Sequence, residues 1–172
     1  VPARGGIGEA ITVQANSVSA RMAAKANGNH RALYVPEQLS LATYNSLLNE
    51  PSIQEVLNLI SEANCVIHSI GRALHMAARR KMTEKELVML KQANAVAESF
   101  GYFFNEKGEV VYKVPRIGIE LQDLEKVPII MAIAGGKSKA KAIRAYMKNA
   151  PKQTWLITDE AAANEILKGV TL

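Results

Sequence analysis

The chain has 172 residues, of which 48% are hydrophobic and 22% are charged, and its formal net charge is +5. These proportions are typical of a globular domain that has a substantial core. No apolar run reaches the roughly 18 residues needed to cross a bilayer and no signal peptide is visible, so we expect a cytoplasmic protein without membrane contact. The positive charge favours anionic ligands or partners, but it does not show whether the partner is a sugar phosphate or DNA.

Predicted strands and helices alternate along the chain. Val1–Ala3 is typical of the end of a strand, and Arg4–Gly8 predicts a glycine-rich turn. Apolar runs bounded by turn residues then predict strands at 31–35, 64–70, 95–104, 110–112, 127–133 and 155–157. Apolar spacing of helical period predicts helices at 16–26, 39–50, 52–60, 84–91, 137–148 and 160–167. The alternation, with one hairpin turn at Asn105–Gly108, predicts an open α/β sheet in a single domain spanning residues 1–172.

Local signals mark several helix ends. The sequences at 52–55 and 83–86 have the form of capping boxes, so we expect a helix to begin at each of them. Thr158 or Asp159 is expected to cap the last helix, and Gly169 is expected to stop it.

Sulfur and histidine chemistry is sparse. Cys65 is the single cysteine and lies in an apolar run, which predicts a buried, reduced thiol. Met22 is expected on the inward face of the first helix. His30, His68 and His75 are scattered, with no thiol or carboxylate at metal-ligand spacing, so we expect neither a metal site nor a cofactor.

The segment Val127–Lys139 is the most informative part of the sequence. Its apolar run predicts a strand buried on both faces, and the run stops at Gly135 and Gly136 before a basic helix. Glycines at such a turn let the backbone approach a ligand, and the N–H groups at a helix start favour a phosphate. Lys139 falls in register with Ile143 on the inward side of the helix, where a lysine is costly unless it meets an anion.

Other cations of this helix form a separate stripe, which we interpret as a solvated face and call the basic stripe: Lys137, Lys141, Arg144 and Lys148. Two further strand ends also deliver glycine and a cation. They are Arg4 with Gly5, and Gly71 with the cations that follow it. In open α/β sheets, ligands lie beyond the carboxyl ends of the strands, so the three strand ends together predict one anion site.

Several side chains are candidates for ligand contacts. Arg4 has a planar fork that can bind phosphate through two hydrogen bonds, and a surface arginine is the equal alternative. Of Arg79 and Arg80, we expect one to bind and the other to be solvated. Glu98 would accept hydrogen bonds from sugar hydroxyls, unless it is a strand-edge glutamate. Gln14 is a weaker polar candidate that could merely cap the backbone.

The sequence lacks the common catalytic motifs: it has no G-x-S-x-G elbow, no thiol paired with histidine, no P-loop and no paired-carboxylate spacing. Anion-binding groups without a nucleophile or base favour binding over turnover, so we assign no catalytic residue. Two alternatives stay open. One is a sugar-phosphate isomerase or deaminase with Glu98 as the base. The other is a non-specific nucleic-acid binder that uses the basic stripe.

A set of ordered motifs carries a resemblance to a known family. The motifs are Pro2–Gly6, Gln14–Asn16, Ile70–Gly71, Ala95–Glu98 with Phe103–Phe104, Ala134–Gly136 with Lys139–Ala140, and Leu156–Glu160. Together they resemble the sugar-binding effector domain of the SorC family of bacterial transcription regulators, over nearly the whole chain. The resemblance implies a Rossmann-like, mostly parallel sheet with helices on both faces, of the type shared with sugar-phosphate isomerases and CoA transferases. It also implies a phosphorylated sugar effector, with fructose 1,6-bisphosphate as the best guess.

The resemblance assigns roles to particular residues. The family's effector contacts map onto Arg4, Arg79, Glu98 and Lys139, and less securely onto Gln14 and Arg80; Gly5, Gly135 and Gly136 belong to the matching loops. Many relatives have Gly-Ala-Val-Gly where this chain has Asn94–Ala97. That departure predicts a narrower pocket beside Glu98.

The resemblance also places this chain within a longer protein. It implies that the family's first βα unit and its DNA-binding helix-turn-helix precede Val1. The chain would then be the C-terminal portion of an effector domain, and it would reach DNA through the missing N-terminal part. The whole protein would be a homo-oligomer, a dimer or a tetramer, whose assembly on DNA responds to the effector.

Overall fold

The structure is a computed structural model, and it describes residues 1–6, 14–37 and 39–168. The predicted turn at Arg4–Gly8 lies partly outside these residues, and the predicted helix stop at Gly169 lies wholly outside them. None of the helices in the described part of the chain has the length and apolar character that a membrane crossing requires.

The chain forms two compact units, which are described separately. The first unit comprises Val1–Asn64 and Val114–Val127, and the second comprises Cys65–Lys113 and Pro128–Leu172.

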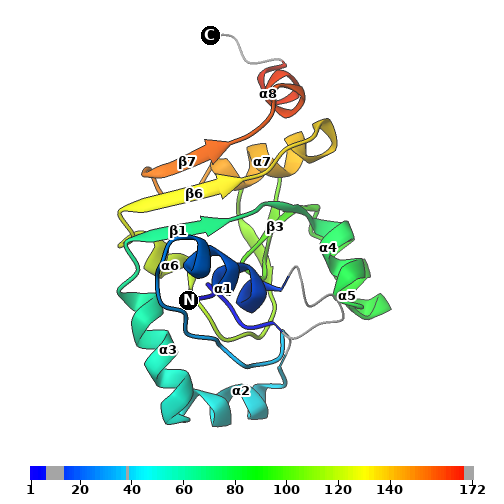
Figure 1. The fold of residues 1–172 in the computed structure, drawn as a ribbon. Helices are drawn as coiled ribbons and strands as arrows, with labels where there is room; N and C mark the ends of the chain where they lie inside the picture. Colours follow the sequence, from blue (N-terminus) through cyan, green and yellow to red (C-terminus); the bar gives the residue numbers. More distant parts are fainter. Residues whose placement is uncertain (7–13, 38, 169–172) are drawn as a thin grey trace. The chain divides into compact units, whose positions relative to one another are not determined.

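The first unit is helical, with α1 (Ala15–Lys25), α2 (Leu41–Leu48), α3 (Pro51–Ser61) and α6 (Leu121–Leu124) (Figure 1). Segment 31–35, predicted as a strand, pairs with no strand among the described residues, although its Leu33 is fully buried. The side-chain amide of Asn16 explains this. Its Nδ2 donates to the Leu33 carbonyl at 3.0 Å, and its Oδ1 accepts from the Leu33 N–H at 2.9 Å. The backbone groups that a neighbouring strand would bind are therefore already satisfied.

Two other predictions for the first unit are wrong. Val1–Ala3 forms no strand, and the chain there makes one isolated bridge, between Arg4 and Gly118. Met22, predicted to face inward, is 47% exposed, and no other residue of α1 is buried. The amphipathic pattern of this helix therefore does not produce a buried face.

The second unit contains two sheets and most of the helices (Figure 1). A parallel sheet has the order β1-β6-β7, with strands at Cys65–His68, Ile129–Ile133 and Thr154–Ile157. An antiparallel sheet has the order β2-β3-β4-β5, with strands at Gly71–Arg72, Ala95–Ser99, Tyr102–Asn105 and Val110–Lys113. The helices are α4 (Ala73–Arg79), α5 (Glu84–Gln92), the 3₁₀ helix η2 (Lys137–Lys139), α7 (Ala140–Met147) and α8 (Glu160–Leu167). The predicted α/β fold with a parallel sheet is confirmed, and the single predicted hairpin belongs to a larger antiparallel sheet.

The predicted strand 95–104 is two strands. β3 and β4 are joined by a turn at Phe100 and Gly101, whose φ angles are 54° and 83°. Turns with positive φ at both central residues match the twist of a hairpin, which is why the chain reverses here. The next turn, Asn105–Gly108, is confirmed by the Gly108 N–H, which donates to the Asn105 carbonyl at 3.0 Å.

The predicted caps have mixed outcomes. The capping box at 83–86 is confirmed, with both of its reciprocal hydrogen bonds present at the start of α5. Asp159 caps α8, accepting from the Ala162 N–H at 2.8 Å. The capping box at 52–55 is wrong. α3 begins one residue earlier, at Pro51, whose fixed φ suits the first helical position.

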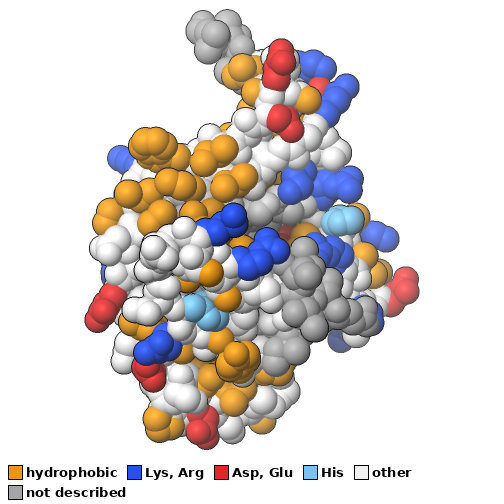
Figure 2. All heavy atoms as spheres, viewed as in Figure 1, with side chains coloured by type: hydrophobic (Ala, Val, Ile, Leu, Met, Phe, Trp, Pro, Cys, Tyr) orange, Lys and Arg blue, Asp and Glu red, His pale blue; other side chains and the backbone are white. Residues whose placement is uncertain are grey.

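The parallel sheet has one buried and one exposed face. Ile130 and Ala132 of β6 are fully buried, whereas the alternate residues Ile129 and Ile133 are 42% and 45% exposed. The same alternation occurs on β7, where Trp155 is 67% exposed. Figure 2 shows hydrophobic side chains gathered over the position of these strands. The predicted burial of the 127–133 strand on both faces is therefore wrong, and Cys65, predicted to be buried, is exposed as well.

Candidate functional site

The glycine turn after β6 is occupied by a carboxylate of the chain itself. The Gly136 N–H donates to Asp159 Oδ2 at 2.6 Å, and Gly136 has a φ of 92°. A Cβ on Gly135 would lie 2.6 Å from the same oxygen, so only glycine allows this close approach. The turn does bind an anionic group, as its N–H donors favour, but that group is Asp159. A phosphate at this turn would have to compete with this carboxylate or bind beside it.

Lys139 differs from the other cations that follow β6. It lies at the end of η2, is half-buried, and its ammonium makes no hydrogen bond or ion pair with any residue that the structure describes. By contrast, Lys137 pairs with Glu165 at 3.8 Å, and Lys141 pairs with Glu106 at 2.6 Å. The residues of the basic stripe are exposed, as predicted for a solvated face. A cation that is half-buried and unpaired within the described chain is the stronger candidate for an anionic ligand.

The basic stripe borders a surface hollow of about 380 Å³, which Glu106 and Glu165 also line. These carboxylates offset part of the positive charge, and Arg144 donates to the carbonyls of Glu165 and Ile166 near the end of α8. The stripe therefore has structural partners. That weakens the nucleic-acid alternative, which needs an uncompensated cationic surface.

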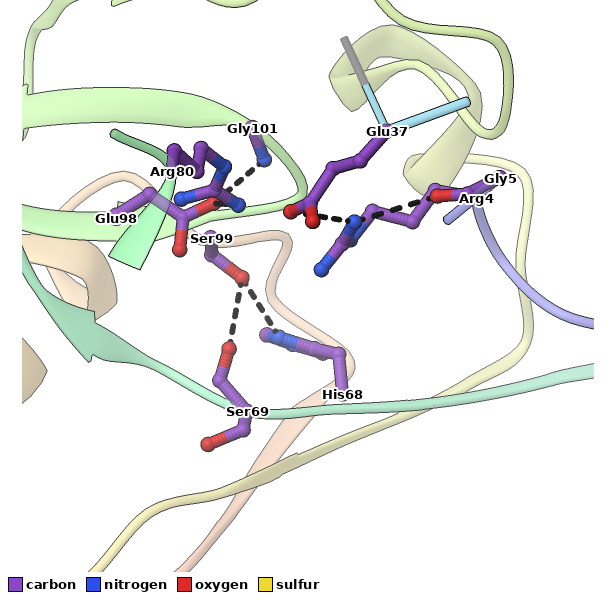
Figure 3. Close-up of polar contacts among 9 residues, drawn as sticks. All are labelled: Arg4, Gly5, Glu37, His68, Ser69, Arg80, Glu98, Ser99 and Gly101. Carbon is purple, nitrogen blue, oxygen red and sulfur yellow. Dashed lines mark hydrogen bonds and ion pairs between the residues drawn. The ribbon is translucent and has the colours of Figure 1, made fainter. Parts of the chain in front are cut away.

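Arg80 and Glu98 form a buried ion pair (Figure 3). Arg80 Nη2 donates to Glu98 Oε1 at 2.9 Å, and the side chains are 3% and 5% exposed. The Gly101 N–H donates to the same Oε1 at 2.7 Å. The guanidinium of Arg80 also lies 6.0 Å from the ring centre of Phe103, within range of a cation–π contact. Neither of these two predicted ligand-contact candidates is a solvated surface charge.

The second oxygen of Glu98 remains free for a ligand. Oε2 accepts no hydrogen bond from the described residues, since both donors to this carboxylate reach Oε1. Gly71 lies opposite Glu98 on β2, and a Cβ at Gly71 would come within 3.5 Å of Oε2. The same Cβ would lie 2.4 Å from Met76 Cγ, so glycine at this position lets the Met76 side chain pack beside Glu98. A carboxylate oxygen of this kind accepts a hydrogen bond from a hydroxyl group.

Arg79 and Arg80 differ in burial, and the prediction that one binds a ligand while the other is solvated does not describe Arg80, which is neither solvated nor at the surface. Arg79 is the last residue of α4, is exposed, and its guanidinium has no partner in the part of the chain that the structure describes. Arg80 is buried against Glu98. Arg79 is therefore the arginine that can meet a phosphate, and Arg80 is the one that holds Glu98.

Arg4, Gly5 and Gln14 belong to the first unit. Arg4 Nη1 donates to Glu37 Oε1 at 3.0 Å and to the Gly5 carbonyl at 3.3 Å (Figure 3). A Cβ on Gly5 would lie 2.0 Å from Val35 Cγ2, so glycine is required there for packing. Gln14 is the N-cap residue of α1, but its side chain makes no capping hydrogen bond. The predicted ligand contacts of Arg4 and Gln14 stay predictions.

His68 is half-buried, and the sequence assigned it no role beyond that of a scattered histidine. Its Nδ1 lies 2.9 Å from Ser99 Oγ, and its Nε2 lies 3.3 Å from the Tyr146 hydroxyl. Burial lowers the pKa of His68 from 6.5 to about 4, so the imidazole is neutral at physiological pH. The residue type alone does not predict this arrangement. The one available signal was the position of His68 near the carboxyl end of a predicted strand.

The fold is a mixed α/β domain in which Lys139 follows a strand of the parallel sheet and Glu98 lies on the antiparallel sheet. Residues 1–168 match the family model described as "Putative sugar-binding domain", and the chain belongs to this family. A solved structure of a "putative SorC family transcriptional regulator" from Enterococcus faecalis is 80% identical, with a TM-score of 0.89 over 96% of this chain and 67% of that chain. The resemblance to the SorC family that the motifs predicted is thereby confirmed.

A more distant solved structure shares the fold, and two curated relatives share half of the sequence. The full-length sorbitol operon regulator SorC from Klebsiella pneumoniae shares the fold, with 16% identity and a TM-score of 0.85 over 96% of this chain and 56% of that chain. The central glycolytic genes regulators of Bacillus subtilis and Priestia megaterium are each 50% identical over 168 residues, which is 98% of this chain and 49% of each regulator. The chain thus spans about half the length of the curated relatives it matches. Both relatives are named as regulators, which gives the isomerase or deaminase alternative no support.

Proposed function

We propose that the chain is the effector-binding part of a bacterial transcriptional repressor of glycolytic genes, and that its effector is fructose 1,6-bisphosphate. The observation that carries this proposal is a pair of groups in the second unit. The ammonium of Lys139 and Oε2 of Glu98 both lack a partner among the described residues, although both side chains are at least partly buried. The 50% identity to two central glycolytic genes regulators supports the glycolytic assignment.

Each group has a chemical role in this proposal. Lys139 binds one phosphate as a compact charge, together with N–H groups at the start of η2. Arg79 binds the other phosphate through its planar fork. Glu98 accepts a hydrogen bond from a sugar hydroxyl through Oε2, and Arg80 fixes the carboxylate by occupying Oε1. Arg4 and Gln14 are predicted as further contacts.

Regulation follows from differential affinity. If the effector binds one conformation or subunit arrangement of a dimer or tetramer more tightly than another, it shifts the population toward that state. The affinity for DNA then changes by the same coupling free energy. The contact with DNA itself would belong to a helix-turn-helix outside this chain, as the family resemblance implies.

A thermal-shift experiment with a panel of sugars tests the proposal. A ligand that binds only the native state raises its stability by about 2.7 kcal/mol at a concentration of 100 times Kd. We expect fructose 1,6-bisphosphate to give the largest shift, its monophosphates to give smaller ones, and unphosphorylated fructose to give none. Equal shifts from inorganic sulfate at the same ionic strength would show that the protein binds any anion. No shift from any sugar phosphate would contradict the proposal.

A further inference from the structure

His68 connects three elements of the second unit. It lies at the end of β1, its Nδ1 meets Ser99 on β3, and its Nε2 meets Tyr146 on α7. The imidazole also packs against the Phe100 ring, with 4.4 Å between ring centroids, and against the Tyr146 ring at 5.2 Å. One side chain therefore ties the parallel sheet, the antiparallel sheet and a helix together.

The hydrogen bonds around His68 are satisfied by a single tautomer. The Ser99 hydroxyl donates its proton to the Ser69 carbonyl at 3.1 Å, so its oxygen accepts from the imidazole (Figure 3). The Nδ1 of His68 must then carry the proton, and Nε2 accepts from the Tyr146 hydroxyl. Every donor in this series has an acceptor. Protonation of Nε2 would break the series, because imidazolium has no acceptor to offer.

The neighbours of His68 lead directly to the proposed ligand-binding groups. Ser99 follows Glu98 in sequence on β3. Tyr146 lies on α7, which begins directly after Lys139, and the two residues are about two helical turns apart on the same side of the helix. α7 also packs against β3. The imidazole thus links β3, the strand that carries Glu98, to α7, the helix that follows Lys139.

The turn beside His68 carries backbone strain. Phe100 has a φ of 54°, a left-handed conformation that is unfavourable for a bulky residue, where asparagine or glycine is usual. Its ring is nevertheless 6% exposed and packs on the imidazole. The Gly101 N–H that binds Glu98 Oε1 belongs to this same turn. Strain of this kind persists where the surrounding structure over-determines it, often at functional sites.

We propose that His68 is a positioning residue of the effector site: as a neutral bridge between Ser99 and Tyr146, it fixes the spacing between Glu98 and Lys139 that a phosphorylated sugar requires. The inference rests on the proposed function. It assigns His68 no contact with the ligand. Loss of the His68 bridge should lower the affinity only for ligands that contact both Glu98 and Lys139. A ligand that binds Lys139 alone does not depend on the distance between the two groups.

The test removes single hydroxyl groups, because replacing the imidazole itself would delete both of its hydrogen bonds and its ring contacts at once. Tyr146→Phe and Ser99→Ala each delete one partner of His68. Tyr112→Phe is the matched control, since its hydroxyl donates to Glu86 at 2.8 Å on another part of the second unit. The affinity of the full-length protein is measured by calorimetry for fructose 1,6-bisphosphate and by NMR titration for inorganic phosphate, with urea unfolding as a check on stability.

Tyr146→Phe and Ser99→Ala are expected to weaken the binding of fructose 1,6-bisphosphate by about tenfold, as the loss of one well-placed contact does, and to leave the binding of inorganic phosphate unchanged. Tyr112→Phe is expected to change neither. Equal weakening of both ligands, or unchanged affinity for the bisphosphate, would overturn the positioning role while the proposed function stands. A wild-type protein that binds inorganic phosphate but no sugar phosphate would overturn the proposed function, and this inference with it.

Discussion

Replacing Arg80 should destabilise the protein far more than replacing its neighbour Arg79. The Arg80–Glu98 pair is 3% and 5% exposed, with 2.9 Å between Nη2 and Oε1. Arg80→Met leaves the Glu98 carboxylate buried with the Gly101 N–H as its donor among the described residues. Removing one partner of a buried ion pair typically costs about 3–5 kcal/mol, because the other charge stays out of water without compensation. We expect a loss of this size in the free energy of unfolding.

Urea unfolding monitored by circular dichroism measures this loss. Arg79→Met is the control: Arg79 is exposed, so the change should stay within about 0.5 kcal/mol. A double variant, Arg80→Met with Glu98→Gln, removes the uncompensated charge and should recover most of the stability, while it still weakens effector binding. A loss below about 1 kcal/mol in Arg80→Met alone would refute the claim that this ion pair is buried and structurally required.

Three further predictions concern the same unit. Asp159→Asn removes the carboxylate that competes with phosphate for the Gly136 N–H. Phosphate binding, measured by calorimetry, should strengthen about fivefold, which corresponds to about 1 kcal/mol of lost repulsion. Weaker binding would count against competition at this turn. The pKa of His68 is about 4 in the folded protein and 6.5 in the unfolded chain, so the unfolded chain binds the proton first as the pH falls. The free energy of unfolding should therefore fall by up to about 1.4 kcal/mol per pH unit between about pH 6.5 and pH 4. The His68→Asn variant should lose this dependence on pH. Gly135→Ala places a Cβ 2.6 Å from Asp159 Oδ2 and should cost about 1–3 kcal/mol in thermal melts, whereas Gly28→Ala, with 3.8 Å to its nearest atom, should not.

Features that depend on local chemistry were predictable from the sequence. The capping box at 83–86 and the Asp159 cap are contacts within a few residues, so their residue types determine them. The turn at Asn105–Gly108 is predictable for the same reason. The capping box at 52–55 failed although it has the right residues, because Pro51 offers a better first position for the helix.

Features that depend on tertiary packing were not predictable. The strand of Ile129 and Ile133 is apolar on both sides, so its sequence does not show that one face is exposed. Arg79 and Arg80 are adjacent and chemically identical, and only the fold shows which of them meets Glu98. The carboxylate of Asp159 caps α8 as predicted, but its second contact, with Gly136, joins residues far apart in the sequence.

The most direct test of the proposed function compares two lysines of the same basic segment. Lys139 is half-buried and unpaired within the described residues, whereas Lys137 is exposed and pairs with Glu165. Calorimetric titration of fructose 1,6-bisphosphate into the wild-type protein, Lys139→Ala and Lys137→Ala separates their roles. We predict saturable binding to the wild-type protein, a loss of at least about tenfold in affinity for Lys139→Ala, and nearly unchanged affinity for Lys137→Ala. Undiminished binding by Lys139→Ala would contradict the account.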